Sequence, residues 1–94
     1  MSLFLVEYTY APEKNAARDA IRADHRAWLT DLLERDIVLS SGPFADGLGA
    51  LIIVDTADAE TVALLFTHDP FAIADLIANV RITEWVPVLG QFSG

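Results

Sequence analysis

The sequence predicts an α+β fold of the ferredoxin-like type, with the element order β-α-β-β-α-β, a four-stranded antiparallel sheet and helices on one face. Three observations support this prediction. Short stretches of strand-forming residues occur near both ends of the chain and in its middle, two stripes with helical spacing separate them, and glycine and proline mark the turns. With 94 residues we expect a single domain, 1–94.

The first strand is predicted over residues 2–10, which are rich in aromatic and aliphatic side chains. Pro12 ends it, and the longest helical pattern follows from Glu13 to Arg35. Its apolar stripe comprises Ala17, Ile21, His25, Trp28, Leu29 and Leu32, whereas Arg18, Arg22, Arg26 and Asp19 fall mostly off it. The helix therefore places a titratable ring, that of His25, among core residues.

The middle of the chain predicts two strands joined by a loop or hairpin. Residues 37–41 form a short apolar run that Gly42-Pro43 breaks. Asp46, Gly47 and Gly49 are turn residues, and Asp46 is interpreted as a turn former rather than an acid. Residues 50–54 are nearly continuous in apolarity, so we expect this third strand to be covered on both faces.

The second helix is predicted over residues 56–68, with Asp58 or Thr56 as its N-cap. The Asp69-Pro70 step ends it, because a residue before proline is pushed out of the helical region. Pro70 can then begin a short helix that continues to Leu76.

Residues 79–88 alternate apolar and polar side chains and predict the fourth strand, with Pro87 at its end or edge. The helices cover one face of such a sheet and leave the other bare. Hydrophobic residues make up 53% of the chain and the mean hydropathy is +0.37, which leaves excess apolar surface to cover. We therefore expect a homodimer that packs sheet to sheet, a dimeric α+β barrel, with assembly beyond the dimer left open.

The composition argues against several classes of function. Without cysteine the chain has no disulfide, thiolate metal site or cysteine nucleophile. A net charge of −8 with only six Lys and Arg argues against nucleic acid as a partner. No apolar run approaches the roughly 18 to 20 residues that span a bilayer, so we expect no membrane partner and a cytoplasmic location.

The strongest candidate for chemistry is His25 together with the stretch His68-Asp69-Pro70-Phe71. If His25 and Asp69 meet, the carboxylate can fix the imidazole tautomer and stabilise its protonated form, so that His25 acts as a general base or acid. Such a pair contributes about 10² to 10⁴ in rate. The competing interpretation is structural: a core histidine with a satisfied hydrogen bond, and an aspartate that caps a turn.

The substrate-binding candidates are Ser41, Gly42, Pro43 and Phe71. Ser41 offers a hydroxyl and Gly42 allows close backbone approach, although the same residues could simply end a strand. No G-x-S-x-G elbow surrounds Ser41, which argues against acyl transfer. Phe71 is a core or interface aromatic if it does not form a pocket wall.

Asp24, His25, His68 and Asp69 are the residue types that could ligate a metal. Neighbouring helical residues point about 100° apart, so Asp24 and His25 cannot readily chelate one ion. We expect His68 to face solvent. We therefore predict no metal site and no cofactor.

Taken together, these motifs resemble the YCII-related (YciI-like) family. The resemblance rests on residues 22–29 with His25, on Ser41-Gly42-Pro43, on Asp46 with its glycines, on Asp69-Pro70-Phe71 and on a late Trp85; Trp28 stands where the family commonly has tyrosine. It implies a ferredoxin-like, dimeric α+β barrel with His25 and Asp69 as an active-site dyad. One branch of that family is associated with dehydrochlorination of chlorinated hydroxyhydroquinones.

Three hypotheses of function follow. The first is a small dimeric acid-base enzyme, a lyase, isomerase or hydrolase, that acts on a small organic and possibly aromatic molecule through His25 and Asp69. The second is a non-catalytic dimerisation or small-ligand-binding module that uses the same pocket. The third, a cofactor-free monooxygenase, rests on analogy of fold alone.

Overall fold

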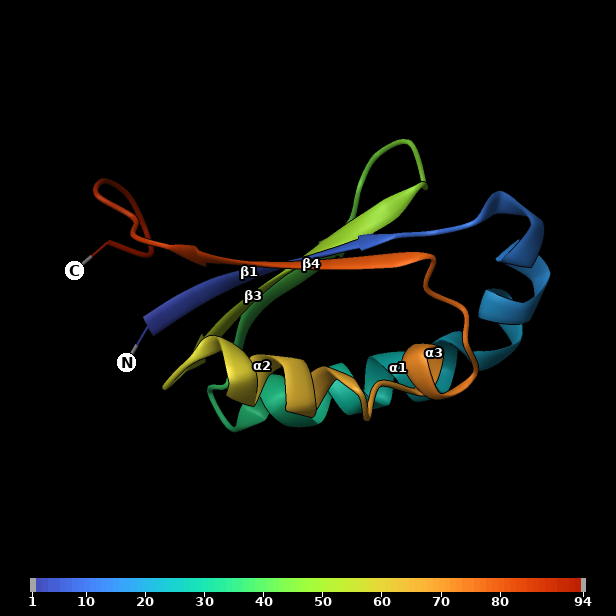
Figure 1. The fold of residues 1–94 in the computed structure, drawn as a ribbon, viewed down its shortest axis with the longest axis horizontal. Coiled ribbons are helices and arrows are strands. Elements are labelled where there is room, and N and C mark those ends of the chain that lie inside the picture. Colours follow the sequence, from blue (N-terminus) through green and yellow to red (C-terminus); the bar gives the residue numbers. More distant parts are fainter. Residues whose placement is uncertain (1, 94) are drawn as a thin grey trace.

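A computed structural model of the chain describes residues 2–93 and contains a four-stranded antiparallel sheet in the order β2-β3-β1-β4 (Figure 1). The predicted ferredoxin-like fold is confirmed. In chain order the elements are β1 (Ser2–Thr9), the 3₁₀ turn η1 (Pro12–Lys14), α1 (Asn15–Glu34), β2 (Val38–Pro43), β3 (Gly49–Thr56), α2 (Ala59–Phe66), α3 (Pro70–Ile73) and β4 (Asn79–Trp85).

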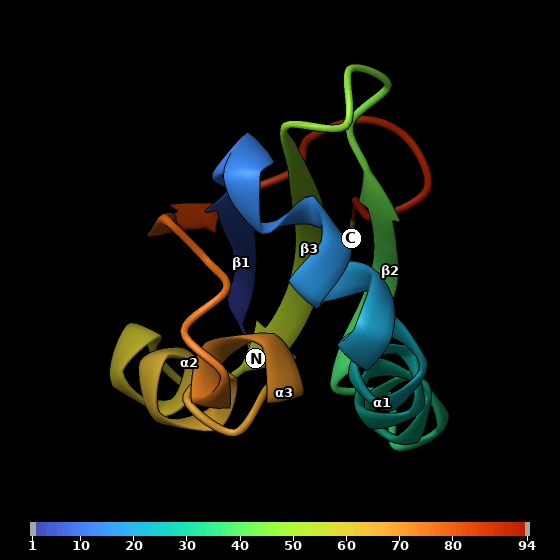
Figure 2. The same cartoon turned by 90° about the vertical axis from the view of Figure 1, so that its right-hand side faces the viewer.

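The sheet and the helices form two layers, with all three α-helices on the same side of the sheet (Figure 1). Seen from the right-hand side of Figure 1, α1 lies beneath β2 at one edge of the sheet, while α2 and α3 lie beneath the other half (Figure 2). Alternate residues of β1, namely Phe4, Val6 and Tyr8, are buried toward the helices, as strand geometry requires. The remaining core residues are Leu32, Val38, Ala50, Ile52, Val54, Val62 and Phe66.

The opposite face of the sheet carries the residues that alternate with the buried ones along each strand. Leu5 pairs with Ile53, Glu7 with Leu51, and Leu3 with Trp85. Leu5 and Leu51 are half-buried there without any helix over them. Residues of β3 are apolar on both faces, but the prediction that this strand is covered on both faces is wrong for the single chain, because the helices lie on only one side of the sheet. Within residues 2–93, no helix has the length and apolarity that a membrane crossing demands.

Several element ends differ from the sequence prediction. Gly42 and Pro43 extend β2 instead of breaking it, because β2 is an edge strand where a residue without an N–H is tolerated. The short helix stops at Ile73 rather than Leu76, since Asp75 adopts a left-handed conformation with φ 57°. The fourth strand ends at Trp85 rather than at residue 88.

The buried face of α1 also differs from the predicted apolar stripe. Ala17 is exposed, whereas Arg18, predicted to fall off the stripe, is only 2% exposed. Arg18 donates hydrogen bonds to the Ala11 carbonyl (3.0 Å) and to the Asn15 side chain. Its guanidinium carbon lies 4.3 Å from the centroid of the Tyr10 ring. Hydrogen bonds and an aromatic face thus replace the water that a buried arginine loses.

We predict that Gly49→Ala destabilises the chain. Gly49 is buried opposite Thr9, and a Cβ there would overlap the Tyr8 carbonyl oxygen, which as backbone in the centre of the sheet cannot move aside. Overpacking of this kind costs about 1–3 kcal/mol of unfolding free energy. Urea unfolding measures the loss.

Gly42→Ala is the matched control, because beyond its chain neighbours no described atom lies within 4 Å of a Cβ at that position. Its unfolding free energy should stay close to that of the wild type. Equal losses in the two variants would contradict the packing explanation.

Candidate active site

His25 and Asp69, 44 residues apart in the sequence, are in direct contact. The Nδ1 atom of His25 lies 2.7 Å from Oδ1 of Asp69. His25 comes from the middle of α1 and Asp69 from the turn between α2 and α3. Both are buried, with 8% of His25 and none of Asp69 exposed. The fold therefore brings together the two residues that sequence analysis paired.

The Asp69 carboxylate accepts three hydrogen bonds. Besides the contact with His25, Oδ1 accepts from the Phe71 backbone N–H at 2.9 Å, and Oδ2 accepts from the Tyr8 hydroxyl at 2.6 Å. Asp69 is thus both the cap of α3 and the partner of the histidine, so the two interpretations of this residue hold together. A buried carboxylate requires such saturation because an unpaired charge in the interior is very costly.

These hydrogen bonds assign the His25 tautomer. Since Tyr8 and the Phe71 amide both donate to Asp69, the carboxylate is an acceptor, and His25 completes the set by donating from Nδ1–H. Nε2 is then the free ring nitrogen. The Phe71 ring stacks on the imidazole with 3.9 Å between centroids and 4° between planes, which fixes the ring orientation.

Tyr8 is a site residue that sequence analysis missed. It lies on β1, and the pattern Phe4, Val6, Tyr8 already placed it on the buried face. A buried tyrosine hydroxyl needs a hydrogen-bond partner, so the alternation in β1 was the signal that could have identified Tyr8 as a partner of a buried polar group. Burial, reinforced by the Asp69 charge, raises the pKa of Tyr8, which keeps the phenol protonated and able to donate.

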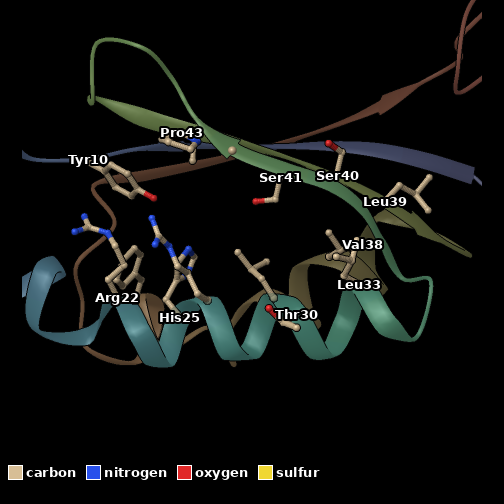
Figure 3. Close-up of a pocket in the computed structure, with 15 residues that line it drawn as sticks. Tyr10, Arg22, His25, Thr30, Leu33, Val38, Leu39, Ser40, Ser41 and Pro43 are labelled. Atoms are coloured by element: carbon tan, nitrogen blue, oxygen red, sulfur yellow. The ribbon is translucent and has the colours of Figure 1, made fainter.

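A cavity of about 560 Å³ opens beside His25, between α1 and β2 (Figure 3). The floor of the cavity is formed by residues of α1 that share one face of the helix, from Arg22 to Leu33. The predicted binding residues Ser41, Gly42, Pro43 and Phe71 all line it. The full lining consists of Tyr10, Arg22, His25, Arg26, Leu29, Thr30, Leu33, Val38, Leu39, Ser40, Ser41, Gly42, Pro43, Ala50 and Phe71.

A β-bulge aims Ser41 into this cavity. Val38 pairs with Val54 but Ser40 pairs with Ile53, so Leu39 is an extra residue in β2. The bulge shifts the alternation, and Ser41 pairs with Ile52 on the helix side of the sheet. Figure 3 shows the Ser41 side chain in the space between β2 and α1. Without the bulge, alternation from Val38 would send it to the opposite face.

The other candidates lie outside the cavity lining. His68 is exposed and Asp46 accepts a hydrogen bond from the Leu48 N–H at 2.9 Å, so both predictions are confirmed. Trp28, at the position where tyrosine was noted, packs edge-on against Phe66, with 5.1 Å between centroids, rather than against a ligand space. Among residues 2–93, no three His, Cys, Asp or Glu side chains are grouped so that they could hold a metal ion.

Comparison with known proteins adds family and fold. The family model of the YCII-related domain matches residues 2–86. No curated protein matches the chain. A similar solved structure is 5-chloro-2-hydroxyhydroquinone dehydrochlorinase (TftG) from Burkholderia phenoliruptrix AC1100, in complex with 2,5-dihydroxybenzoquinone. Its TM-score is 0.78 at 25% sequence identity, and the match covers 88% of this chain and 92% of that chain.

We predict that Tyr8→Phe lowers the free energy of unfolding, because Asp69 loses one of its three hydrogen-bond donors. The variant leaves Oδ2 of a fully buried carboxylate without its 2.6 Å donor. An unsatisfied buried acceptor costs about 1–3 kcal/mol. Tyr10→Phe is the control, since that hydroxyl borders the cavity. Urea unfolding should show the larger loss for Tyr8→Phe, and equal losses would contradict the assignment.

Alkaline pH tests the same hydrogen bond. Because the pKa of Tyr8 is raised on folding, the folded chain holds this proton at pH values where the unfolded chain has lost it. This contribution to stability is complete below about pH 10, the ordinary tyrosine pKa, and declines as pH rises above it. Tyr8→Phe should therefore show a shallower alkaline decline in unfolding free energy than wild type.

Proposed function

The chain belongs to the YCII-related domain family, and from this premise we propose that it is a small acid-base enzyme acting on a small aromatic molecule. In this proposal His25 is the general base or acid and Asp69 orients it. The observation that carries the proposal is the buried His25–Asp69 pair beside an open cavity of about 560 Å³.

The geometry suits proton transfer at Nε2 of His25. Asp69 holds Nδ1–H, so the lone pair on Nε2 is free to take a proton from a molecule in the cavity. The imidazolium that forms lies between the Asp69 carboxylate and the face of the Phe71 ring, and both stabilise positive charge. Asp69 cannot turn away, because Tyr8 and the Phe71 amide hold its oxygens.

The similar solved structure supports the choice of substrate class. Its name describes removal of hydrogen chloride from a chlorinated hydroxyhydroquinone, and its ligand is a dihydroxybenzoquinone. Loss of hydrogen chloride requires a base that takes a proton while chloride leaves with the bonding electrons. His25 is the residue we propose for that step. Phe71, Ser41, Gly42 and Pro43 are proposed to contact the substrate, because they border the same cavity.

We also propose that the active form is a homodimer. Leu5, Leu51, Ile53 and Trp85 give the helix-free face of the sheet an apolar character. A second chain packed sheet to sheet would remove that surface from water.

We predict that His25→Gln lowers the rate of chloride release from 5-chloro-2-hydroxyhydroquinone by about 10² to 10⁴. Asp69→Asn should lower it as well, because the amide no longer fixes Nδ1–H or stabilises the imidazolium. Ion chromatography of released chloride measures both rates. His68→Gln is the matched control, since His68 is exposed and away from the cavity lining.

The tautomer can be observed without a substrate. Long-range ¹H–¹⁵N NMR spectra, recorded at a pH where imidazole is neutral and assigned with His68→Gln, should show the Nδ1–H form of His25 in wild type. A mixture of tautomers should appear in Asp69→Asn. Wild-type chloride release by His25→Gln would contradict the catalytic role, and ligand binding without any turnover would favour a binding module.

We predict that Leu51→Lys separates the dimer into monomers. Leu51 lies on β3 at the helix-free face, opposite Glu7, where a lysine is tolerated in a single chain but places its charge in the apolar contact of a pair. Leu64→Lys on the outer side of α2, where Leu64 is 69% exposed, is the control. Sedimentation velocity should give twice the monomer mass for wild type and the control. A monomeric wild type would refute the dimer.

A further inference from the structure

We propose that the cavity beside His25 selects an aromatic ligand that carries an ionised oxygen, and that Arg22 and Arg26 recognise its negative charge. The aromatic part of this inference rests on the proposed function above. The preference for an anion rests on the residues of the cavity alone.

Positive charge is concentrated at this cavity. The chain has a net charge of −8 and only six Lys and Arg, yet two of those six line this one cavity. None of the described lining residues is Asp or Glu. A third cation, Arg18, lies against the ring of Tyr10, which lines the cavity. A locally cationic cavity on an acidic protein raises the local concentration of anions against the overall charge.

The two arginines lie close to the proposed base along α1. Arg22, His25 and Arg26 lie within a little more than one turn of α1, so all three side chains can face the same space. Figure 3 shows Arg22, Tyr10 and His25 grouped at one end of the cavity. An ionised oxygen bound there places the attached ring within reach of Nε2 of His25.

The guanidinium groups of Arg22 and Arg26 have N–H donors left for a ligand. The ion pairs of residues 2–93 include Arg22 with Asp19 but not Arg26. The Arg22–Asp19 pair is open to solvent, with 39% and 66% of the side chains exposed, and such pairs are weak. A guanidinium has five N–H donors, so a ligand oxyanion can bind beside Asp19 or replace it. Asp69, behind His25, already accepts from three donors.

Tyr10 adds a neutral donor at the same end. Burial raises the pKa of Tyr10, with a further contribution from Asp69 that Arg18 and Arg22 partly offset, so the group remains a phenol. Arg18 on its face and Phe71 at 6.0 Å in an edge contact hold the ring in place. Tyr10 and the arginines can thus donate to an oxyanion at this end, and Figure 3 shows the Ser41 hydroxyl near the middle of the cavity, between the two ends.

The other end of the cavity is mainly apolar. Figure 3 shows Leu33, Val38 and Leu39 there, away from the arginine end, with Ser40 beside them. A ligand with a charged oxygen at one end and an apolar ring toward the other would satisfy both ends. A neutral polar ligand would bring no negative charge to Arg22 and Arg26.

Calorimetric titration with two matched pairs of probes tests the inference. The first pair is benzoate and neutral benzamide. The second is 2,5-dihydroxybenzoquinone, whose hydroxyl groups are acidic, and neutral 2,5-dimethoxybenzoquinone. In at least one pair we expect the anion to bind about tenfold more tightly than its neutral partner, and the pair that shows this identifies a carboxylate or an ionised enol. Added salt should weaken only the anion.

Variants locate the preference. Arg22→Gln and Arg26→Gln should each weaken binding of the anion about tenfold and leave the neutral probe unchanged. Arg35→Gln, an exposed arginine at the end of α1 outside the cavity lining, is the matched control. Equal affinity for the anion and its neutral partner in both pairs would overturn the inference. So would an Arg35→Gln variant that loses as much affinity for the anion as Arg22→Gln and Arg26→Gln do.

This test is independent of catalysis. His25→Gln should lower turnover by about 10² to 10⁴, as predicted above, yet retain the preference for the anion. Anion selectivity in a wild type without turnover would refute only the proposed enzymatic function, whereas turnover without anion selectivity would refute only this inference.

Discussion

The site depends on one buried carboxylate that must have all its hydrogen bonds. Asp69 is fully buried, and its three donors come from β1, from α1 and from the first turn of α3. A charge in the interior is tolerated only with such partners, so losing any of the three elements would leave the carboxylate unsatisfied. The same contacts that hold sheet and helices together therefore also set the tautomer and the direction of His25.

Helix α1 contributes side chains to two places, the core and the cavity. Leu32 faces the core, while a neighbouring stripe from Arg22 to Leu33 forms the floor of the cavity. His25 lies where the two stripes meet, with Nδ1 turned to the buried Asp69 and the ring at the cavity wall. On the cavity side of α1, Arg22 and Arg26 line a space whose described lining contains no Asp or Glu, although the chain as a whole is acidic.

Local patterns predicted most of the architecture, because apolar residues recur with a different spacing in strands and in helices. The caps were also local: Asp58 accepts from the Thr61 N–H at 2.8 Å, as expected for an N-cap. The errors fall where a neighbour overrides the local pattern. Arg18 is buried because Tyr10 and the Ala11 carbonyl receive it, and Pro43 stays in a strand because that strand is at an edge.

The sequence by itself determined the fold class, the placement of His25 on a buried helix face and the candidacy of Asp69, since these follow from spacing within single elements. Tertiary structure alone decided which side chains meet. The 2.6 Å contact of Tyr8 with Asp69 joins residues 61 positions apart, and the bulge at Leu39 that turns Ser41 toward α1 exists only in the pairing of β2 with β3. Such contacts depend on strand register and on packing between elements. The spacing of residues within a single strand or helix does not specify either of them.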